Sequence, residues 1–343
     1  MRMKRLGQYG PQVSALGLGC GGMSPQKRPG GDDESIATIQ AALDAGISYL
    51  DTGDFYGMGH NESLIGRAIK GRRDQAFLSV KFGMMLSPSG TFLGLDGRPN
   101  SVKNFASYSL QRLGVDVIDL YQPGRPDPSV PYEETIGAIA DLIKEGLVRY
   151  LGVSEVGADN LSRAHSVHPV TALEIEYSLA CRFIEPEILP TARELGVAVV
   201  PYRVLADGLL TGSVTEETTQ GDRHFLPPRL QGDNLKHNIA TASFLKEVAA
   251  DKGYTSAQLA VAWLLTRGDD IFPLVGMSRR SRLPENLEIL NITFSVDELA
   301  ALDQAFAPGA IVGERYPAFV QKYAAQYSFI PKDQDIEGRS SSP

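Results

Sequence analysis

An aspartate, a lysine and a tyrosine stand at or just beyond the ends of two apolar segments of the chain. Asp51 lies in ISYLDT at 47–52, Lys81 lies in FLSVKF at 77–82, and Tyr56 follows Asp51 by five residues. A bare charge near the end of a buried strand is costly unless it is paired. Neighbouring strands lie about 4.8 Å apart, so Asp51 and Lys81 can form an ion pair if the two segments are adjacent strands.

Proton transfer is the chemistry open to these three side chains. The phenol of a tyrosine has an ordinary pKa of about 10, which is too high for an efficient acid at neutral pH. A nearby ammonium such as that of Lys81 lowers the pKa of the phenol, and Asp51 would keep the ammonium charged and oriented. We predict that Tyr56 donates a proton to a carbonyl oxygen. The alternative is an ion pair that only braces two strand ends.

A repeating unit in the sequence supplies the elements that position these residues. An amphipathic helix ends in glycine and a short apolar strand follows, with examples at 41–52, 109–121, 140–154, 191–202 and 263–276. Glycine suits the left-handed residue just past a helix end. Apolar strands that alternate with helices predict a parallel sheet buried on both faces. Further strands at 15–19, 77–82 and 172–178 bring the expected number to eight.

Eight such units without a linker between halves predict an α/β fold of the (β/α)8 TIM barrel type. The opening residues 4–15 predict an N-terminal β-hairpin, and extra helices are expected within 213–253 and 295–306. We expect one domain over 1–330 and a tail over 331–343 that is flexible or appended to the natural chain. In such barrels the chemistry lies at the C-terminal ends of the strands, where Asp51, Lys81 and Tyr56 stand.

Composition narrows the partners and the compartment. The 343 residues carry a net charge of −8 without a basic tract, which argues against nucleic acid or an anionic membrane as partner. No apolar run reaches the length of a transmembrane helix, and the N-terminus lacks the apolar core of a signal peptide. The two cysteines, Cys20 and Cys181, make no disulfide framework and favour the reducing cytoplasm. A homo-oligomer is left open.

The segment GLGCGG at 17–22 fits the G-x-G-x-x-G spacing of Rossmann dinucleotide sites. In that fold the third glycine must open a helix that faces the pyrophosphate. Here Met-Ser-Pro follows, and Pro25 and Pro29 stand in the way of a helix. We therefore predict a glycine-rich loop that lets a ligand approach the backbone closely, in place of a Rossmann helix.

Seven segments that share one order along the chain carry a family resemblance. They are DTGDFYG (51–57), SVKFG (79–83), DLYQPGRPDP (119–128), YLGVSE (150–155), EIEYSL (174–179), YRVLADGLLTG (202–212) and VGMSRRSRLPENL (275–287). Together they resemble the aldo-keto reductase superfamily, nearest to its aryl-alcohol-dehydrogenase-like bacterial branch, from about residue 5 to 310. The resemblance implies a (β/α)8 barrel that binds NADP(H) across its mouth without a Rossmann fold. It also implies reversible hydride transfer between the nicotinamide and a carbonyl or alcohol substrate.

The resemblance assigns roles to single residues. Tyr56 matches the general acid, with Asp51 and Lys81 as its catalytic partners, and Ser154 matches the serine that binds the nicotinamide carboxamide. Glu155 stands where the family often has Asn. The full implied cofactor-binding set is Gly22, Met23, Asp51, Ser154, Glu155, Glu174, Tyr202, Arg203, Leu205, Gly276, Ser278, Arg279, Arg282, Glu285 and Asn286.

Two members of this set depart from the family pattern or have an alternative role. Glu174 stands where many relatives have Gln, so it places negative charge near the nicotinamide, as Glu155 does. Tyr202 matches the aromatic residue that stacks on the nicotinamide ring, and its alternative is a core tyrosine.

The resemblance also implies a site for the adenosine 2′-phosphate. Arg279 and Arg282 would hold the phosphate, with Arg280 as a further candidate, beside Ser278 where relatives often have Lys or Arg. The residues after them, Glu285 and Asn286, would accept from the adenine amino group. The alternative is a solvated basic turn.

At the end of the fourth predicted strand, Gly124 stands where most of the family has a histidine. The implied substrate pocket is formed by Tyr56, Gly124 and Arg125. An error of register would instead let Arg125, or His60 from the neighbouring loop, fill the place of that histidine. The histidines of the chain show no metal-ligand spacing, which argues against a metal-dependent barrel hydrolase. An NADPH-binding regulatory or scaffold protein of the same fold is the remaining alternative.

Overall fold

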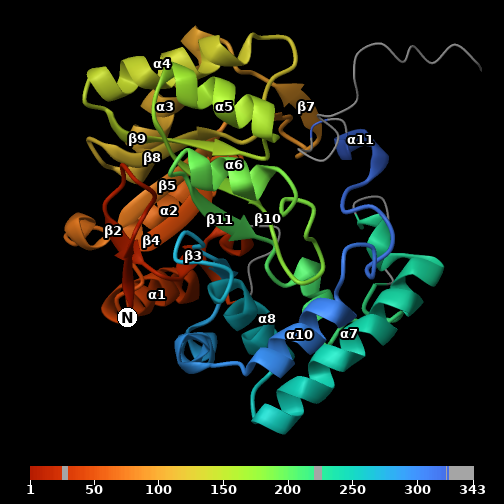
Figure 1. The fold of residues 1–343 in the computed structure, drawn as a ribbon. Coiled ribbons are helices and arrows are strands. Elements are labelled where there is room, and N and C mark those ends of the chain that lie inside the picture. Colours follow the sequence, from red (N-terminus) through yellow and green to blue (C-terminus); the bar gives the residue numbers. More distant parts are fainter. Residues whose placement is uncertain (25–29, 220–225, 322, 324–343) are drawn as a thin grey trace, which may run out of the picture.

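A sheet of eight parallel strands forms the centre of the molecule (Figure 1). The computed structural model describes residues 1–24, 30–219, 226–321 and 323. The strands of the sheet lie in the order β11-β10-β9-β8-β5-β4-β3-β12. A parallel bridge between Val199 and Ile271 joins the two edges of the sheet. The predicted (β/α)8 barrel is therefore confirmed. Its strands are β3 (Gly17–Gly19), β4 (Tyr49–Gly53), β5 (Phe77–Phe82), β8 (Ile118–Pro123), β9 (Val148–Ser154), β10 (Val170–Glu176), β11 (Ala198–Tyr202) and β12 (Leu274–Gly276).

Helices of the repeat cover the outside of the barrel (Figure 1). Helix α4 shows why these segments are helical, because Glu133 and Glu134 in its first turn and Lys144 in its last turn complement the helix dipole. Its buried residues include Ile136 and Ile139, which lie on the face packed against the sheet. The helices are α1 (Gly31–Asp44), α2 (His60–Ala68), α3 (Pro99–Leu113), α4 (Tyr132–Lys144), α5 (Ala158–Val167), α6 (Ile188–Glu194) and α8 (Ser256–Leu265).

The N-terminal hairpin closes one end of the barrel. Strands β1 (Met3–Arg5) and β2 (Gln12–Ser14) pair antiparallel, as predicted. Leu6 and Val13 of the hairpin belong to a buried apolar cluster with Tyr49 and Phe77, the first residues of β4 and β5. Apolar side chains therefore fill the N-terminal end of the barrel interior. The opposite end holds the polar residues described below.

Additional elements lie outside the repeat. Helix α7 (Gly232–Lys252) and helix α10 (Val296–Ala305) fall within the two segments where extra helices were expected, and Figure 1 shows them at one edge of the barrel. The hairpin of β6 (Met84–Leu86) and β7 (Phe92–Leu95) was not predicted, because turn-forming residues interrupt its short strands.

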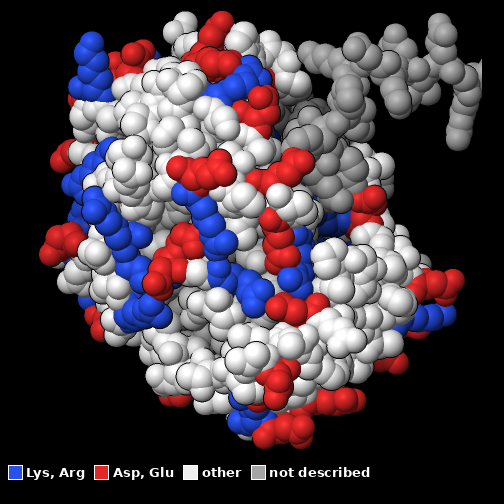
Figure 2. Space-filling view, viewed as in Figure 1, with Lys and Arg blue, Asp and Glu red and all other residues white. Residues whose placement is uncertain are grey.

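Pro25, Pro29 and the tail 331–343 lie outside the described residues. The division into a domain over 1–330 and a tail stays a prediction. Among the helices that the structure describes, none is long and apolar enough to cross a membrane. On the face shown in Figure 2, acidic and basic side chains are interspersed with broad uncharged areas.

Candidate active site

The carboxyl ends of β4 and β5 bring Asp51 and Lys81 together. The two strands pair in parallel, with Gly53 opposite Lys81. The Lys81 ammonium donates to both carboxylate oxygens of Asp51 at 2.6 Å. Both side chains are buried. The ion pair expected from the sequence is therefore present, at the end of the barrel where chemistry is expected.

A turn after β4 places Tyr56 beside this pair. The Tyr56 N–H donates to the Gly53 carbonyl at 3.0 Å, and Asn61 N–H donates to the Tyr56 carbonyl at 3.2 Å. Buried Asn61 also ties the turn to β3, because its amide donates to the Cys20 carbonyl at 2.9 Å. The Lys81 ammonium lies 5.3 Å from the centroid of the Tyr56 ring. Tyr56, Lys81 and Asp51 thus form one group.

The pKa of Tyr56 differs from what the sequence led us to expect. Burial raises the pKa of Tyr56 to about 12, and this outweighs the ammonium of Lys81, which acts in the opposite direction. The expected lowering by the lysine is therefore present but is not the larger effect. The phenol is fully protonated at neutral pH, as a proton donor must be.

Glu174 of β10 belongs to the same group, which the sequence did not reveal. Its two carboxylate oxygens accept from the Lys81 ammonium at 3.1 and 3.2 Å. Gln122 of β8 donates to Glu174 at 2.7 Å and to the Ser79 hydroxyl at 3.1 Å. Two buried carboxylates thus share a single lysine. Gln122 and Ser79 were also missed, because nothing in their local sequence distinguishes them from other strand residues.

Ser154 ends β9 with a buried hydroxyl that has no hydrogen-bond partner among the described residues. The Oε1 atom of Gln122 is likewise buried without a partner. An unsatisfied buried polar group costs about 1–3 kcal/mol, so a ligand that pairs with it at the barrel mouth gains affinity. Ser154 therefore fits the carboxamide-binding role that the resemblance implies, by an observation independent of the family.

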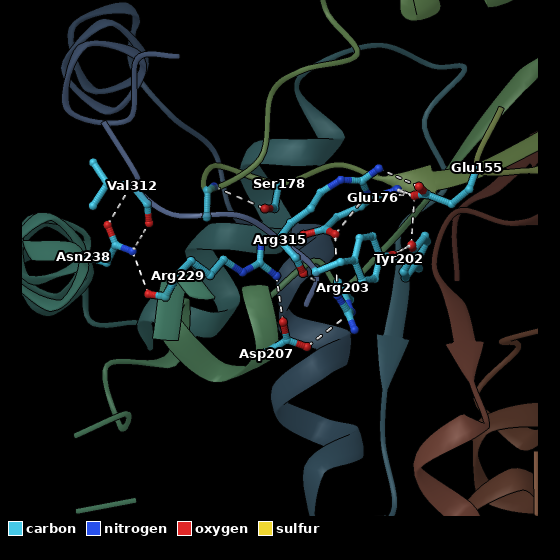
Figure 3. A network of polar contacts seen from close by, with 12 residues as sticks. Glu155, Glu176, Ser178, Tyr202, Arg203, Asp207, Arg229, Asn238, Val312 and Arg315 are labelled. Atoms are coloured by element: carbon cyan, nitrogen blue, oxygen red, sulfur yellow. Dashed lines mark hydrogen bonds and ion pairs between the residues drawn. The ribbon is translucent and has the colours of Figure 1, made fainter. Parts of the chain in front are cut away.

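Glu155 follows Ser154 and is held by a residue from the C-terminal segment (Figure 3). Its carboxylate accepts from Arg315 at 2.6 and 3.0 Å, from the Tyr202 hydroxyl at 2.8 Å and from the Glu176 N–H at 3.0 Å. Burial alone would raise the pKa of Glu155, but the guanidinium groups of Arg315 and Arg125 hold it well below its usual value. Glu155 is thus an ionised carboxylate that Arg315 neutralises.

Tyr316 of the C-terminal segment lies against Tyr202, and their hydroxyls are in hydrogen-bond contact. Arg125 at the end of β8 donates to the Tyr202 hydroxyl at 3.1 Å and to the Tyr316 hydroxyl at 3.0 Å. Arg125 therefore reaches from β8 toward β11 and the C-terminal segment. Sequence reasoning missed Tyr316 and Arg315, because they follow the last repeat and carry no periodic pattern.

Hydrogen bonds to helix α7 and to the turn just before it hold this C-terminal segment in place (Figure 3). Asn238 of α7 accepts from the Val312 N–H at 2.9 Å and donates to the Val312 carbonyl at 2.8 Å. The Arg229 N–H donates to the Glu314 carbonyl at 3.2 Å. The side chain of Arg315 therefore enters the barrel mouth from a backbone whose preceding residues are held by hydrogen bonds.

Arg203 and Leu205, which were assigned to the cofactor site, both follow β11, and Arg203 belongs to the same network. Arg203 lies 3.3 Å from Asp207 and donates to the Arg315 carbonyl at 3.2 Å. Arg229, which is fully buried, joins Asp207 at 2.7 Å to Glu176 at 2.6 Å. Their roles toward a cofactor stay predictions.

The basic segment after β12 lies against helix α1. Arg280 donates to Glu34 of α1 at 2.8 Å, and Arg282 donates to Glu285 at 2.9 Å. Arg279 has no carboxylate within ion-pair distance among the residues that the structure describes. Of the three arginines, Arg279 is therefore the one whose charge is left for a phosphate. The segment begins after Gly276, the last residue of β12, and also contains Ser278 and, in helix α9 (Leu283–Glu288), Asn286.

Gly124 follows β8 directly, and its N–H donates to the Phe82 carbonyl at 2.8 Å. A Cβ atom at Gly124 would lie 3.3 Å from the Phe55 ring and 3.4 Å from Met84. The space that a histidine side chain would fill at this position is therefore narrowed by Phe55 and Met84. His60 does not replace the missing side chain, because its ring lies 3.1 Å from Asp32 of α1.

Gly124→His is expected to fold, because the atoms that its Cβ approaches belong to side chains that can shift slightly. The imidazole adds a donor to the developing oxyanion and takes up space beside Tyr56. We expect the ratio of kcat/KM for a small aldehyde over a bulky ketone to rise roughly tenfold or more. An unchanged ratio in a folded variant with normal NADPH affinity would show that Gly124 does not line the site.

A barrel with acid–base groups and unsatisfied polar atoms at its carboxyl end has the general form of barrel enzymes. The model of the Aldo/keto reductase family matches residues 15–307. The chain therefore belongs to the aldo-keto reductase family, whose members are oxidoreductases that act on carbonyl compounds. The bacterial branch named above stays a prediction.

Individual relatives agree with this assignment. The chain is 37% identical over 336 residues to "Probable aldo-keto reductase 1" of Glycine max, and the match covers 97% of each sequence. It superimposes on a glycerol dehydrogenase from Gluconobacter oxydans with a TM-score of 0.80 and 28% identity, covering 89% of this chain and 95% of the other. A thermostable aldo-keto reductase in complex with the inhibitor epalrestat gives a TM-score of 0.72 at 30% identity, covering 89% and 100%.

Proposed function

We propose that the protein is an NADP(H)-dependent oxidoreductase that interconverts an aldehyde or ketone and the corresponding alcohol. The observation that carries this proposal is the group of Tyr56, Lys81 and Asp51 at the carboxyl ends of neighbouring barrel strands. A protonated phenol beside a buried ammonium can donate a proton to a carbonyl oxygen and then exist as a phenolate.

The residues of the chain divide the proton chemistry among them. The nicotinamide, when bound, supplies or accepts the hydride. Tyr56 donates the proton to the carbonyl oxygen in reduction and removes it from the alcohol in oxidation. Lys81 stabilises the phenolate form of Tyr56, and Asp51 orients the ammonium through two hydrogen bonds. Release of the carbonyl or alcohol product completes the cycle.

The groups around Tyr56 fit the cofactor. Gly22 has open space where a Cβ would stand, which allows close approach of a ligand to the backbone beside Met23. The unsatisfied Ser154 hydroxyl fits the carboxamide. Tyr202 is assigned to the nicotinamide ring, while its hydroxyl is held by Glu155 and Arg125.

Arg279 is expected to give the enzyme a preference for NADP(H) over NAD(H). Losing one charge-assisted contact to the 2′-phosphate costs about 1.5–3 kcal/mol, or roughly ten- to hundredfold in affinity. Arg279→Ala should therefore weaken NADPH binding by that factor and leave NADH binding unchanged. Arg280→Ala is the matched control with the smaller expected loss, because Glu34 already engages Arg280. Equal affinities of the wild type for NADPH and NADH would contradict this assignment.

A second candidate is an NADPH-binding regulatory or scaffold protein with little turnover. Gly124 favours it, because the family histidine is missing and Phe55 and Met84 pack close to its position. Turnover assays separate the two candidates. For either function we propose a cytoplasmic location, which the two free cysteines, Cys20 and Cys181, support.

A further inference from the structure

The group at the carboxyl ends of β4, β5 and β10 contains one more carboxylate than cations. Asp51 and Glu174 both contact the Lys81 ammonium, and the three side chains are only 4–5% exposed. No other lysine, arginine or histidine lies within ion-pair distance of either carboxylate in the described part of the chain. With both carboxylates ionised, the group would carry a net charge of −1 in the barrel interior.

Neutral neighbours do not remove this excess charge. Gln122 and Ser79 donate hydrogen bonds to Glu174 and Asp51 but carry no charge. A buried net charge is strongly unfavourable, and two carboxylates that face one cation reduce it by sharing one proton. Burial, followed by the charge of Glu174, raises the pKa of Asp51 well above its usual value, against the opposing effect of Lys81. We therefore expect the carboxylate pair to keep one proton at neutral pH.

Apart from Arg125, the other titratable groups around the pair are uncharged. Cys20 just after β3, Tyr49 of β4 and Tyr56 all have their pKa raised by burial. Arg125 carries a charge, but its partners are Tyr202, Tyr316 and the Gly124 carbonyl. The charge of the Asp51–Lys81–Glu174 group therefore responds to any new charge that a ligand brings into this end of the barrel.

We propose that the Asp51–Lys81–Glu174 group selects the oxidised, positively charged nicotinamide over the reduced one, and releases its shared proton when the oxidised form binds. The inference rests on the proposed function. If Tyr56 protonates the carbonyl oxygen, the nicotinamide ring must lie in contact with the same carbonyl group. Lys81 lies 5.3 Å from the Tyr56 ring centroid, so the nicotinamide ring would lie within roughly 10 Å of the two carboxylates.

A charge of −1 at that distance is large enough to bias cofactor binding. With an effective dielectric constant of about 20, the attraction of the fully ionised pair corresponds to a factor of up to about tenfold in affinity for the cationic ring, because part of it offsets the release of the shared proton. The proton passes from the carboxylate pair to solvent, so binding of NADP⁺ is linked to proton release. The reduced ring is uncharged and leaves the proton in place. NADP⁺ affinity should therefore rise with pH relative to NADPH affinity.

Glu174→Gln removes the excess carboxylate while preserving shape and most hydrogen bonds. The variant then contains one carboxylate and one ammonium, and it has no shared proton to lose. Glu155 makes no comparable contribution, because Arg315 neutralises it. The Glu174→Gln protein should therefore prefer the oxidised cofactor less strongly than the wild type does. It should also favour alcohol oxidation less.

Isothermal titration calorimetry of NADP⁺ and NADPH, in buffers of different ionisation enthalpy, tests this proposal. We expect the wild type to release more protons with NADP⁺ than with NADPH, by up to about one proton. Comparison of the two cofactors cancels any titration of their common 2′-phosphate. In Glu174→Gln the difference should vanish, and the affinity ratio of NADP⁺ to NADPH should fall, by up to about tenfold. Asp44→Asn, an equal charge change on the exposed end of α1, should alter neither quantity.

Equal proton release by both cofactors in the wild type would overturn the proposal, even if the Glu174→Gln protein did not fold. An unchanged affinity ratio in folded Glu174→Gln would also overturn it. A wild type that binds neither NADP⁺ nor NADPH would refute the proposed function itself, and this inference with it.

Discussion

Tyr56→Phe is expected to reduce turnover of a carbonyl substrate ~10²–10⁴-fold, the usual contribution of a general acid. The hydroxyl is needed when charge develops on the carbonyl oxygen, and its loss removes an interaction made mainly in the transition state. The ring of Tyr56 and its packing against Phe55 remain in the variant. Affinity for NADPH should therefore stay close to that of the wild type.

Steady-state kinetics with NADPH and a reactive ketone, together with a fluorescence titration of NADPH, measure both quantities. Tyr108→Phe is the matched control, because Tyr108 is 51% exposed on helix α3 and is expected to leave both unchanged. Normal turnover by Tyr56→Phe would rule out Tyr56 as the proton donor.

Arg315→Met is expected to lower the free energy of unfolding by about 3–5 kcal/mol. Arg315 is paired with Glu155 at 2.6 Å and Glu176 at 3.2 Å, and all three side chains are buried. Its removal leaves a buried carboxylate without its cation, which is the costly way to break such a pair. Glu176 keeps Arg229 as a partner, so the main loss falls on Glu155.

The midpoint of urea unfolding, measured across pH, tests this expectation. The pKa of Glu155 is depressed in the folded state, so its stabilisation is present above the ordinary glutamate pKa of about 4.3 and is lost as pH falls below it. Arg315→Met should lose this acid dependence. The control variant Arg163→Met breaks the exposed ion pair with Glu133, and its free energy of unfolding should fall by less than about 1 kcal/mol. Similar losses in both variants would contradict the account.

The barrel was predictable because its signals are local. A helix ending in glycine and followed by an apolar strand recurs along the chain, and each such unit builds one strand and one helix of the observed fold. The pairing of Asp51 with Lys81 was predictable for the same reason, since the two residues end strands that are consecutive in the barrel. Short strands interrupted by turn residues, such as β6 and β7, gave no comparable signal.

Contacts across the barrel could not be predicted from local patterns. Glu174 reaches Lys81 from β10, which is separated from β5 by two other strands of the sheet. Arg315 and Tyr316 reach the mouth from beyond the last repeat, and only the tertiary fold brings them to Glu155 and Tyr202. The raised pKa of Tyr56 likewise depends on its burial, which the sequence does not specify.

The most direct test of the account is an assay of the purified wild-type protein with a panel of aldehydes, ketones and alcohols in both directions. Oxidation of NADPH by carbonyl compounds and reduction of NADP⁺ by alcohols are followed through the absorbance of the reduced nicotinamide. We expect turnover in both directions with at least one carbonyl–alcohol pair, and much weaker turnover with NADH and NAD⁺. Stoichiometric binding of NADPH without turnover on any compound would contradict the proposed function and support the regulatory or scaffold alternative.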